Sequence, residues 1–213
     1  MFTNFVMKLK QLPMKKLLIV LLIPMLASGL ILNGQKISVQ SGKVGVVKGQ
    51  KMLATFDYSG MSVGKFDKED DYIAEKSAEY NKKEAGKGDK WADSWRGDRA
   101  TRYEPKFEEL FNKYGEKTGM TVSRTATDAK YEINIHTVFT EPGFNVGVMR
   151  KPAYTNTIIT FRELATGQEV AVLKVDNCPG MDAMGYDFDT GVRIQESYAK
   201  LGKALSAYIL KQK

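Results

Sequence analysis

The sequence predicts a single α+β domain with a mostly antiparallel sheet of four to five strands and helices packed on one face. Alternating apolar and polar residues over 131–139, the threonine- and isoleucine-rich residues 153–163 and the return run 169–175 predict a C-terminal meander. Apolar residues at helical spacing over 194–208 predict a final helix that lies on this sheet. Helical patterns between an early apolar strand and the meander predict a β-α-β crossover.

The first 34 residues have the order of a secretory signal peptide, with lysines, an apolar run and then small residues that end at Gly29. We expect cleavage after Gly34, with cleavage after Gly29 as the alternative. The apolar run 17–32 contains a proline and is shorter than the ~20 residues that cross a bilayer. No cysteine follows the small residues. We therefore expect an exported protein of the periplasm or cell envelope that is not lipidated and has no transmembrane span after signal removal.

Removal of the signal peptide lowers the net positive charge of the chain. The chain has 32 basic and 25 acidic residues, but four lysines and no acidic residue lie in the signal, which leaves 28 basic residues against 25 acidic ones. Nucleic-acid binding needs a concentrated basic patch, so we expect no nucleic-acid partner. A single cysteine also excludes a disulfide framework within the chain, and stability must come from the core.

The first part of the mature chain predicts an arm, a strand and a helix. Residues 35–50 are expected to form an N-terminal arm, either loose or a peripheral strand, with a short β-like run over 44–47, and residues 51–213 are expected to form the α+β domain. The unbroken apolar residues 52–56 predict a strand buried on both faces, the candidate central strand. Residues 67–84 are acidic at the start and lysine-rich at the end, which favours a helix.

Two further helices are predicted before the meander. Asp89 suits the cap of a short helix that carries Trp91 and Trp95 on one side. Pro105 suits the first turn of the next helix, whose end is marked by a glycine. A short strand over 120–125 then leads into the meander.

Two connections are distinctive in composition. Residues 141–152, EPGFNVGVMRKP, hold two prolines and two glycines and predict a long turn. Residues 177–191, NCPGMDAMGYDFDTG, hold the only cysteine, three aspartates and three glycines. We expect the second segment to be a compact structural connection in which Tyr186 and Phe188 pack inward.

The same segment contains the candidate metal ligands. Asp182, Asp187 and Asp189 could supply oxygen ligands to calcium, which takes about six to eight of them. The spacing departs from that of an EF-hand, because Gly191 follows Asp187 by four residues and Tyr198 stands where the bidentate glutamate should be. Asp189 also suits the cap of the final helix. We expect no cofactor, with calcium as the alternative.

Cys178 is the only candidate thiol nucleophile. A thiol nucleophile needs a base, and the chain has one histidine, His136, in the middle of a predicted strand. We interpret Cys178 as a small buried side chain and His136 as a packed or surface residue. No set of four nitrogen or sulfur ligands exists for zinc.

The segment 91–103, WADSWRGDRATRY, is the candidate ligand-binding surface. Two tryptophans beside three arginines could stack on a sugar or hold an anionic glycan or peptide. The alternative is that the tryptophans dock a short helix onto the core. The candidate binding residues are Trp91, Trp95, Arg96, Arg99, Arg102 and Tyr103.

Several segments resemble an uncharacterised group of exported proteins from Bacteroidota. They are FDYSGMSVGKF, GDKWADSW, RYEPKFEELFNKY, EPGFNVGV and NCPGMDAMGYDFDTGVRIQESYAKLGKAL, and together they extend over nearly the whole mature chain. This resemblance implies export and one domain. The order of a buried strand, a helix, antiparallel strands and the closing YAKLGKAL helix is similar to small envelope domains such as the TolB N-terminal domain and the curli-secretion lipoproteins. That similarity implies binding to other envelope components.

Two classes of function follow. The first is a non-catalytic exported envelope protein that binds a protein, glycan or lipid partner through the sheet face or the tryptophan segment. The alternative is a hydrolase that uses the aspartate-rich loop 176–191, with or without a metal. The sequence indicates no oligomeric state.

Overall fold

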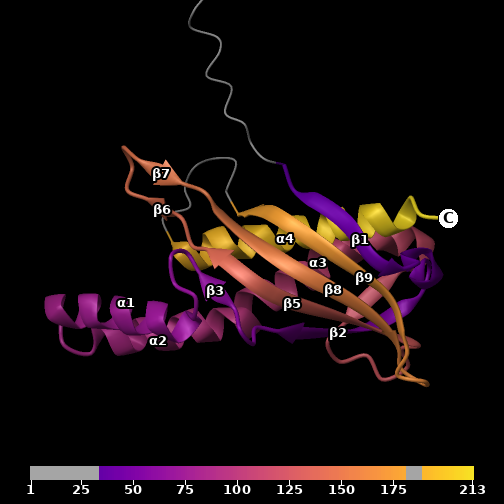
Figure 1. Cartoon of the computed structure of the whole chain (residues 1–213), viewed down its shortest axis with the longest axis horizontal. Coiled ribbons are helices and arrows are strands. Elements are labelled where there is room, and N and C mark those ends of the chain that lie inside the picture. The colour runs from indigo at the N-terminus through magenta and orange to yellow at the C-terminus, as the bar shows by residue number, and fades with distance from the viewer. Residues whose placement is uncertain (1–33, 181–188) are drawn as a thin grey trace, which may run out of the picture. The chain divides into compact units, whose positions relative to one another are not determined.

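The core of the domain is a mixed sheet with the strand order β1-β9-β8-β5-β2-β4, and β3 pairs with β5 beside this path (Figure 1). The computed structural model describes residues 34–180 and 189–213. The expected signal peptide therefore lies outside the described residues, as do Asp182, Tyr186, Asp187 and Phe188. The strands are β1 (Lys36–Gly42), β2 (Lys51–Asp57), β3 (Ser62–Val63), β4 (Thr121–Ser123), β5 (Tyr131–Glu141), β8 (Ala153–Glu163) and β9 (Glu169–Gly180).

The expected meander and crossover are both confirmed. β5, β8 and β9 are antiparallel neighbours, with Ile135 opposite Ile159 and Ile159 opposite Leu173. β2 pairs in parallel with β5, and the chain between them contains three helices, as a crossover connection requires. The α+β fold class predicted from the sequence is correct.

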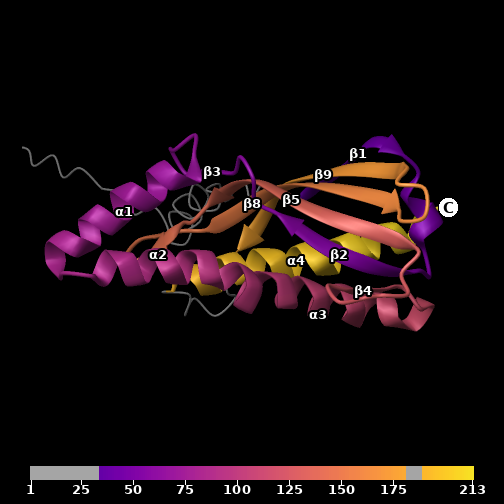
Figure 2. The same cartoon turned by 90° about the horizontal axis from the view of Figure 1, so that it is seen from below.

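Four α-helices accompany the sheet in the part of the chain that the structure describes. They are α1 (Glu69–Lys83), α2 (Lys87–Asp98), α3 (Glu104–Gly115) and α4 (Thr190–Leu210). α3 and α4 run side by side along one face of the sheet, while α1 and α2 form a helical pair that extends past its end (Figures 1 and 2). Val44–Val47 and Glu116–Thr118 form 3-10 turns.

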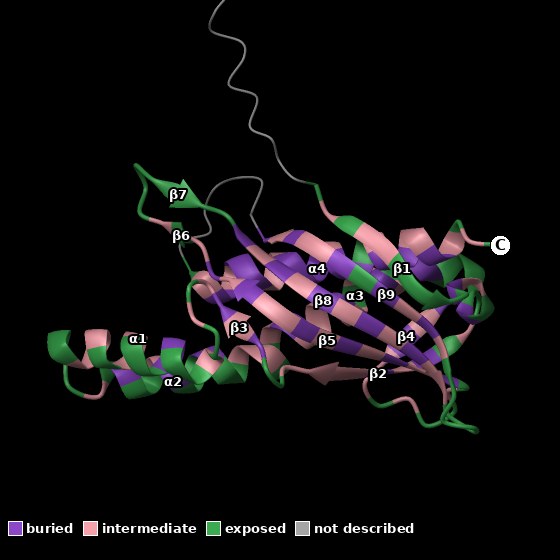
Figure 3. Ribbon diagram, viewed as in Figure 1, coloured by how far each residue is buried: buried purple, intermediate pink, exposed green. Residues whose placement is uncertain are grey.

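Alternation along the strands decides which side chains meet the helices. Ile133 and Ile135 of β5 are fully buried, whereas Glu132, Asn134 and His136 between them are only partly buried. The same alternation forms bands along β8 and β9 (Figure 3). One sheet face therefore forms the core with α3 and α4, and the other face carries mixed polar side chains.

Close packing of α3 on α4 depends on Gly202. A Cβ at this position would lie 2.5 Å from the Phe107 carbonyl oxygen and 3.0 Å from the Phe111 amide nitrogen. Both phenylalanines are fully buried, as is Leu205 one helical turn further along α4. The missing side chain lets the two helix backbones approach and brings these residues into one core.

Four sequence expectations need correction. Residues 44–47 form a 3-10 turn instead of a β-like run, while the expected peripheral strand of this segment is the edge strand β1, which pairs with β9. The candidate central strand β2 lies next to the edge strand β4, and only alternate side chains in it are buried. Gly86, and not Asp89, occupies the N-cap of α2. β9 continues through Asn177, Cys178, Pro179 and Gly180, so the connection to α4 is shorter than expected.

Candidate functional site

The candidate binding residues lie on one nearly continuous helical segment. α2 passes directly into a π-helical turn, Arg99–Tyr103, which passes into α3 without a break. A π turn adds one residue to a helical turn and is frequent at functional sites. The extra residue rotates the side chains after it around the helix axis, so residues of the segment 91–103 point in several directions.

The two tryptophans pack α2 against α1. Trp95 is 6% exposed, its ring centre lies 5.0 Å from that of Tyr72, and its indole nitrogen donates a hydrogen bond to Glu69 Oε1 at 2.6 Å. Trp91 stacks on Trp95 with ring centres 5.7 Å apart and lies 5.7 Å from the Tyr80 ring. Trp91 is only partly buried. The alternative interpretation, in which the tryptophans dock a short helix onto the core, thus holds for Trp95. Trp91 remains partly exposed to solvent.

Arg96 lies apart from Arg99 and Tyr103, which both line a cavity of only about 10 Å³. Arg96 pairs with Asp70 at 3.3 Å on the exposed surface. Arg99 pairs with Glu69 and lies over the Tyr58 ring, 4.3 Å from its centre. Tyr103 is buried and stacks on Tyr198, with ring centres 5.3 Å apart.

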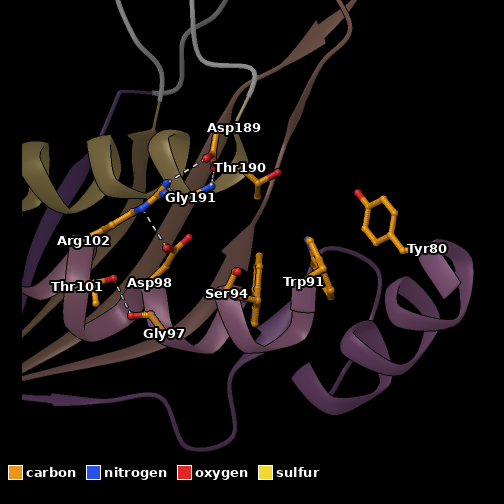
Figure 4. A pocket seen from close by; sticks show the side chains of 11 residues that line it. Tyr80, Trp91, Ser94, Gly97, Asp98, Thr101, Arg102, Asp189, Thr190 and Gly191 are labelled. Carbon is orange, nitrogen blue, oxygen red and sulfur yellow. Dashed lines mark hydrogen bonds and ion pairs between the residues drawn. The ribbon is translucent and has the colours of Figure 1, made fainter. Parts of the chain in front are cut away.

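A pocket of about 550 Å³ lies between α2 and the first turn of α4 (Figure 4). Trp91, Trp95 and Arg102 of the candidate segment line it, and Asp189 of the candidate metal set lies on its opposite side. The structure thus brings together residues that the sequence analysis treated as two separate sites. The full lining is Tyr80, Trp91, Ser94, Trp95, Gly97, Asp98, Thr101, Arg102, Asp189, Thr190 and Gly191.

Arg102 connects the two sides of the pocket. Its Nε lies 3.0 Å from Asp98 Oδ1, and its Nη1 lies 3.1 Å from Asp189 Oδ2. The hydrogen bond to Asp189 raises the pKa of Arg102, which keeps the guanidinium charged. Two carboxylates around one guanidinium leave this group with a net charge of about −1 when all three are ionised.

The two carboxylates have opposite pKa shifts. Burial raises the pKa of Asp98 above its ordinary value, and Arg102 only partly offsets this. Burial would also raise the pKa of Asp189, but the hydrogen bonds from Arg102 and from the Gly191 backbone N–H lower it below its ordinary value. Asp189 therefore remains ionised under mildly acidic conditions.

Asp189 also begins α4. Its side chain accepts hydrogen bonds from the backbone N–H groups of Gly191, at 2.6 Å, and Val192, at 3.4 Å, as an N-cap does. A Cβ on Gly191 would lie 2.1 Å from Asp98 Oδ2 and 2.7 Å from Arg102 Nη1. A side chain here would displace the Asp98 carboxylate or the Arg102 guanidinium, so glycine lets the start of α4 meet this pair without moving either group.

The sequence analysis missed Tyr80, Ser94, Gly97, Asp98 and Thr101. One signal could have found three of them, because Ser94, Asp98 and Thr101 follow Trp91 at successive spacings of three, four and three residues. The start of α4 could not be placed there by spacing, since its position depends on tertiary packing. Tyr80 likewise arrives from α1 through the helical pair.

The remaining candidates lie elsewhere. Cys178 is fully buried, its thiol donates to the Ser197 carbonyl oxygen at 3.1 Å, and burial raises the pKa of Cys178 to about 12. His136 Nε2 lies 2.9 Å from the Ser59 carbonyl oxygen on the open sheet face. Asp182 and Asp187 are outside the described residues, and residues 34–180 and 189–213 contain no group of three or more potential metal-ligating side chains.

No protein-family profile and no curated protein matches the chain. Among solved structures it is similar to the PelC dodecamer from Paraburkholderia phytofirmans, with 10% sequence identity and a TM-score of 0.40 over 81% of this chain and 97% of that chain. A methionine variant of the same PelC matches with 10% identity, a TM-score of 0.41 and the same coverage. Similarity at this level supports no statement about function.

In the described part of the chain, no helix is both long enough and apolar enough to span a bilayer.

Proposed function

We propose that this chain is a non-catalytic exported envelope protein that binds a neutral glycan in the pocket between α2 and α4. The observation that carries this proposal is a pocket of about 550 Å³ that combines a partly exposed tryptophan with hydroxyl and carboxylate groups. Export and membership of the exported Bacteroidota group are part of the same proposal. They rest on the N-terminal sequence pattern and on the resembling segments.

The aromatic residues suit the apolar face of a sugar ring. Trp91 is held on one side by Trp95 and on another by Tyr80, so its orientation is fixed before a ligand arrives. A rigid aromatic surface loses little conformational entropy when a ring stacks on it. The stack on Trp95 therefore favours binding through the exposed part of Trp91.

The polar residues suit sugar hydroxyl groups. Asp98 and Asp189 offer carboxylate oxygens that accept hydrogen bonds, and Arg102 offers donors between them. The hydroxyls of Ser94 and Thr101 donate to helix carbonyls, at 3.0 and 2.9 Å, and keep lone pairs for further donors. A polyhydroxylated ligand can use both kinds of partner at once.

The charges disfavour an anionic ligand. Arg96, Arg99 and Arg102, which the sequence analysis considered for an anionic glycan or peptide, each pair with at least one carboxylate. An anion would have to displace one of these carboxylates, and the Arg102 group already has a net negative charge. A neutral ligand carries no such cost.

Gly97 offers a direct test. It lines the pocket, and a Cβ there would meet no atom within 4 Å. Gly97→Phe should fill the pocket, while Gly97→Ala adds one methyl group and serves as the matched control. Binding of a panel of neutral and anionic polysaccharides can be monitored by tryptophan fluorescence. We expect a neutral ligand that the parent and Gly97→Ala bind equally and that Gly97→Phe does not bind. Equal binding by all three proteins would contradict the proposal.

A second candidate is a glycoside hydrolase. It is favoured by the opposite pKa shifts of Asp98 and Asp189, since such pairs can divide acid and base roles. The bonds of Asp189 to Arg102 and to the start of α4 favour a structural role instead. The test is the appearance of new reducing ends when the bound glycan is incubated with the protein. The non-catalytic proposal expects none.

A further inference from the structure

The connection between β5 and β8 contains an apolar tip that is exposed among the residues the structure describes. It forms a separate two-stranded hairpin, β6 (Phe144–Asn145) with β7 (Arg150–Lys151), which projects from the sheet (Figures 1 and 3). Among the described residues, eight large apolar side chains are exposed, and four of them lie within this hairpin. These four define the hairpin tip: Phe144, Val146, Val148 and Met149. Val148 is 93% exposed.

The base of the hairpin is fixed by a buried arginine. Arg193 of α4 is 2% exposed, and its guanidinium donates to the carbonyl oxygens of Pro142, at 3.1 Å, and Gly143, at 3.2 Å. An isolated two-stranded hairpin is at best marginally stable in water. The Arg193 contacts give this hairpin a defined exit from the domain while its apolar tip remains in solvent. Clustered apolar side chains on a convex tip indicate an interaction site.

The tip suits a bilayer better than a protein surface. A stable protein interface buries about 800 Å² on each partner, with 20–30 residues contributing. Four side chains on a convex tip do not supply such an area. Insertion into the bilayer interface requires only a few apolar side chains that reach about 5–10 Å below the headgroups.

The position of the tip in the fold gives a second, independent argument. Lys36, the first residue of β1, pairs with Asp176, and Ala153, which follows the hairpin, pairs with Gly180. The chain therefore enters the domain at the same end of the sheet from which the hairpin projects. The segment before this entry contains the apolar run 17–32. While that run is still attached, the connection to a membrane and the apolar tip leave from the same end.

We propose that the hairpin tip inserts into the interfacial region of a lipid bilayer. This insertion places the end of the sheet from which the hairpin projects against the membrane. Apolar contact drives the insertion. Lys151 at the base pairs with Glu141 Oε2 at 2.7 Å, so the charge next to the tip is partly neutralised. Binding should therefore occur on zwitterionic as well as anionic lipid. This inference does not depend on a ligand in the α2–α4 pocket.

The test uses the protein purified from the cell envelope, with an environment-sensitive fluorophore attached at Val148→Cys. Cys178 is fully buried, so the folded parent should take up no label. The matched control is a label at Leu164→Cys, because Leu164 is also exposed but lies in the β8–β9 turn at the opposite end of the sheet. With vesicles of phosphatidylcholine alone and with added phosphatidylglycerol, we expect a blue shift at position 148 and none at position 164.

A second measurement uses unlabelled variants. Val148→Asp combined with Met149→Asp should reduce the fraction bound in vesicle sedimentation about tenfold, whereas Leu164→Asp should leave it unchanged. Unchanged thermal unfolding midpoints would show that all variants fold. Equal label responses at positions 148 and 164, unaltered binding of the double variant, or no vesicle binding by the parent would each overturn the proposal. Absence of vesicle binding by the parent would instead indicate that the tip binds a groove on another protein.

Discussion

Replacing Asp189 separates its two roles, the cap of α4 and the ion pair with Arg102. Asp189→Ala removes both. Loss of an N-cap costs about 1 kcal/mol, and a partly exposed ion pair adds about 0.5 kcal/mol. We expect a total destabilisation of about 1.5 kcal/mol. For a domain of this size, that corresponds to a fall of about 3–6 °C in the thermal unfolding midpoint.

Asp189→Asn is the matched control. Asparagine caps helices about as well as aspartate but cannot form the ion pair. We therefore expect Asp189→Asn to cost only about 0.5 kcal/mol, or about 1–2 °C. Thermal unfolding followed by circular dichroism at pH 7 measures both variants. Equal losses for the two, or no loss for Asp189→Ala, would refute the assigned cap.

The pH dependence of stability tests the electrostatic contribution of Asp189 to the folded state. A carboxylate whose pKa is lowered by folding stabilises the folded state above its unfolded-state pKa, and this stabilisation is lost as pH falls through the folded-state pKa. The pKa of Asp189 is lowered by Arg102 and the Gly191 N–H against the effect of burial. The difference between the parent and Asp189→Asn should thus be full at pH 7 and shrink below the ordinary range of aspartate. A difference that grows on acidification would contradict the assigned shift.

Two further outcomes are expected. Gly202→Ala should destabilise the domain by about 1–3 kcal/mol in urea unfolding, because its Cβ would meet the Phe107 carbonyl oxygen at 2.5 Å. An unchanged free energy of unfolding would show that α3 and α4 can move apart at little cost in stability. Cys178 should not react with thiol reagents at pH 8 in the folded protein, since it is fully buried and its pKa is raised to about 12. Rapid labelling before unfolding would disprove this burial.

The sequence predicts the parts of the fold that have one buried face. The alternation in β5 and β8 and the apolar spacing of α4 follow from burial against each other, so the pattern is visible along the chain. β1 gives no such signal, because this edge strand is mostly exposed. Val44 and Val47 resemble a strand in composition but are buried three residues apart, as a 3-10 turn requires.

The candidate site could be predicted only in part, for a physical reason. Spacing along α2 places Trp91 and Asp98 on one face, but the opposite wall comes from the start of α4, about ninety residues later. That approach is possible because Gly191 has no side chain to meet Asp98. The ion pairs of Arg96 and Arg99 depend on the packing of α1 against α2, and the pair of Arg102 with Asp189 depends on the approach of α4. The sequence alone therefore could not show that the pocket disfavours an anionic ligand.

The most direct test of the proposed glycan site is the indole region of a nitrogen–proton NMR spectrum. The chain has only two tryptophans, so two indole signals are expected, and Trp91→Phe assigns them. Both indoles line the pocket, but Trp95 is buried with its indole N–H bonded to Glu69, whereas Trp91 is partly exposed. Titration with the neutral glycan should shift the Trp91 signal strongly and the Trp95 signal little. A glycan that binds without moving the Trp91 signal would contradict binding in this pocket.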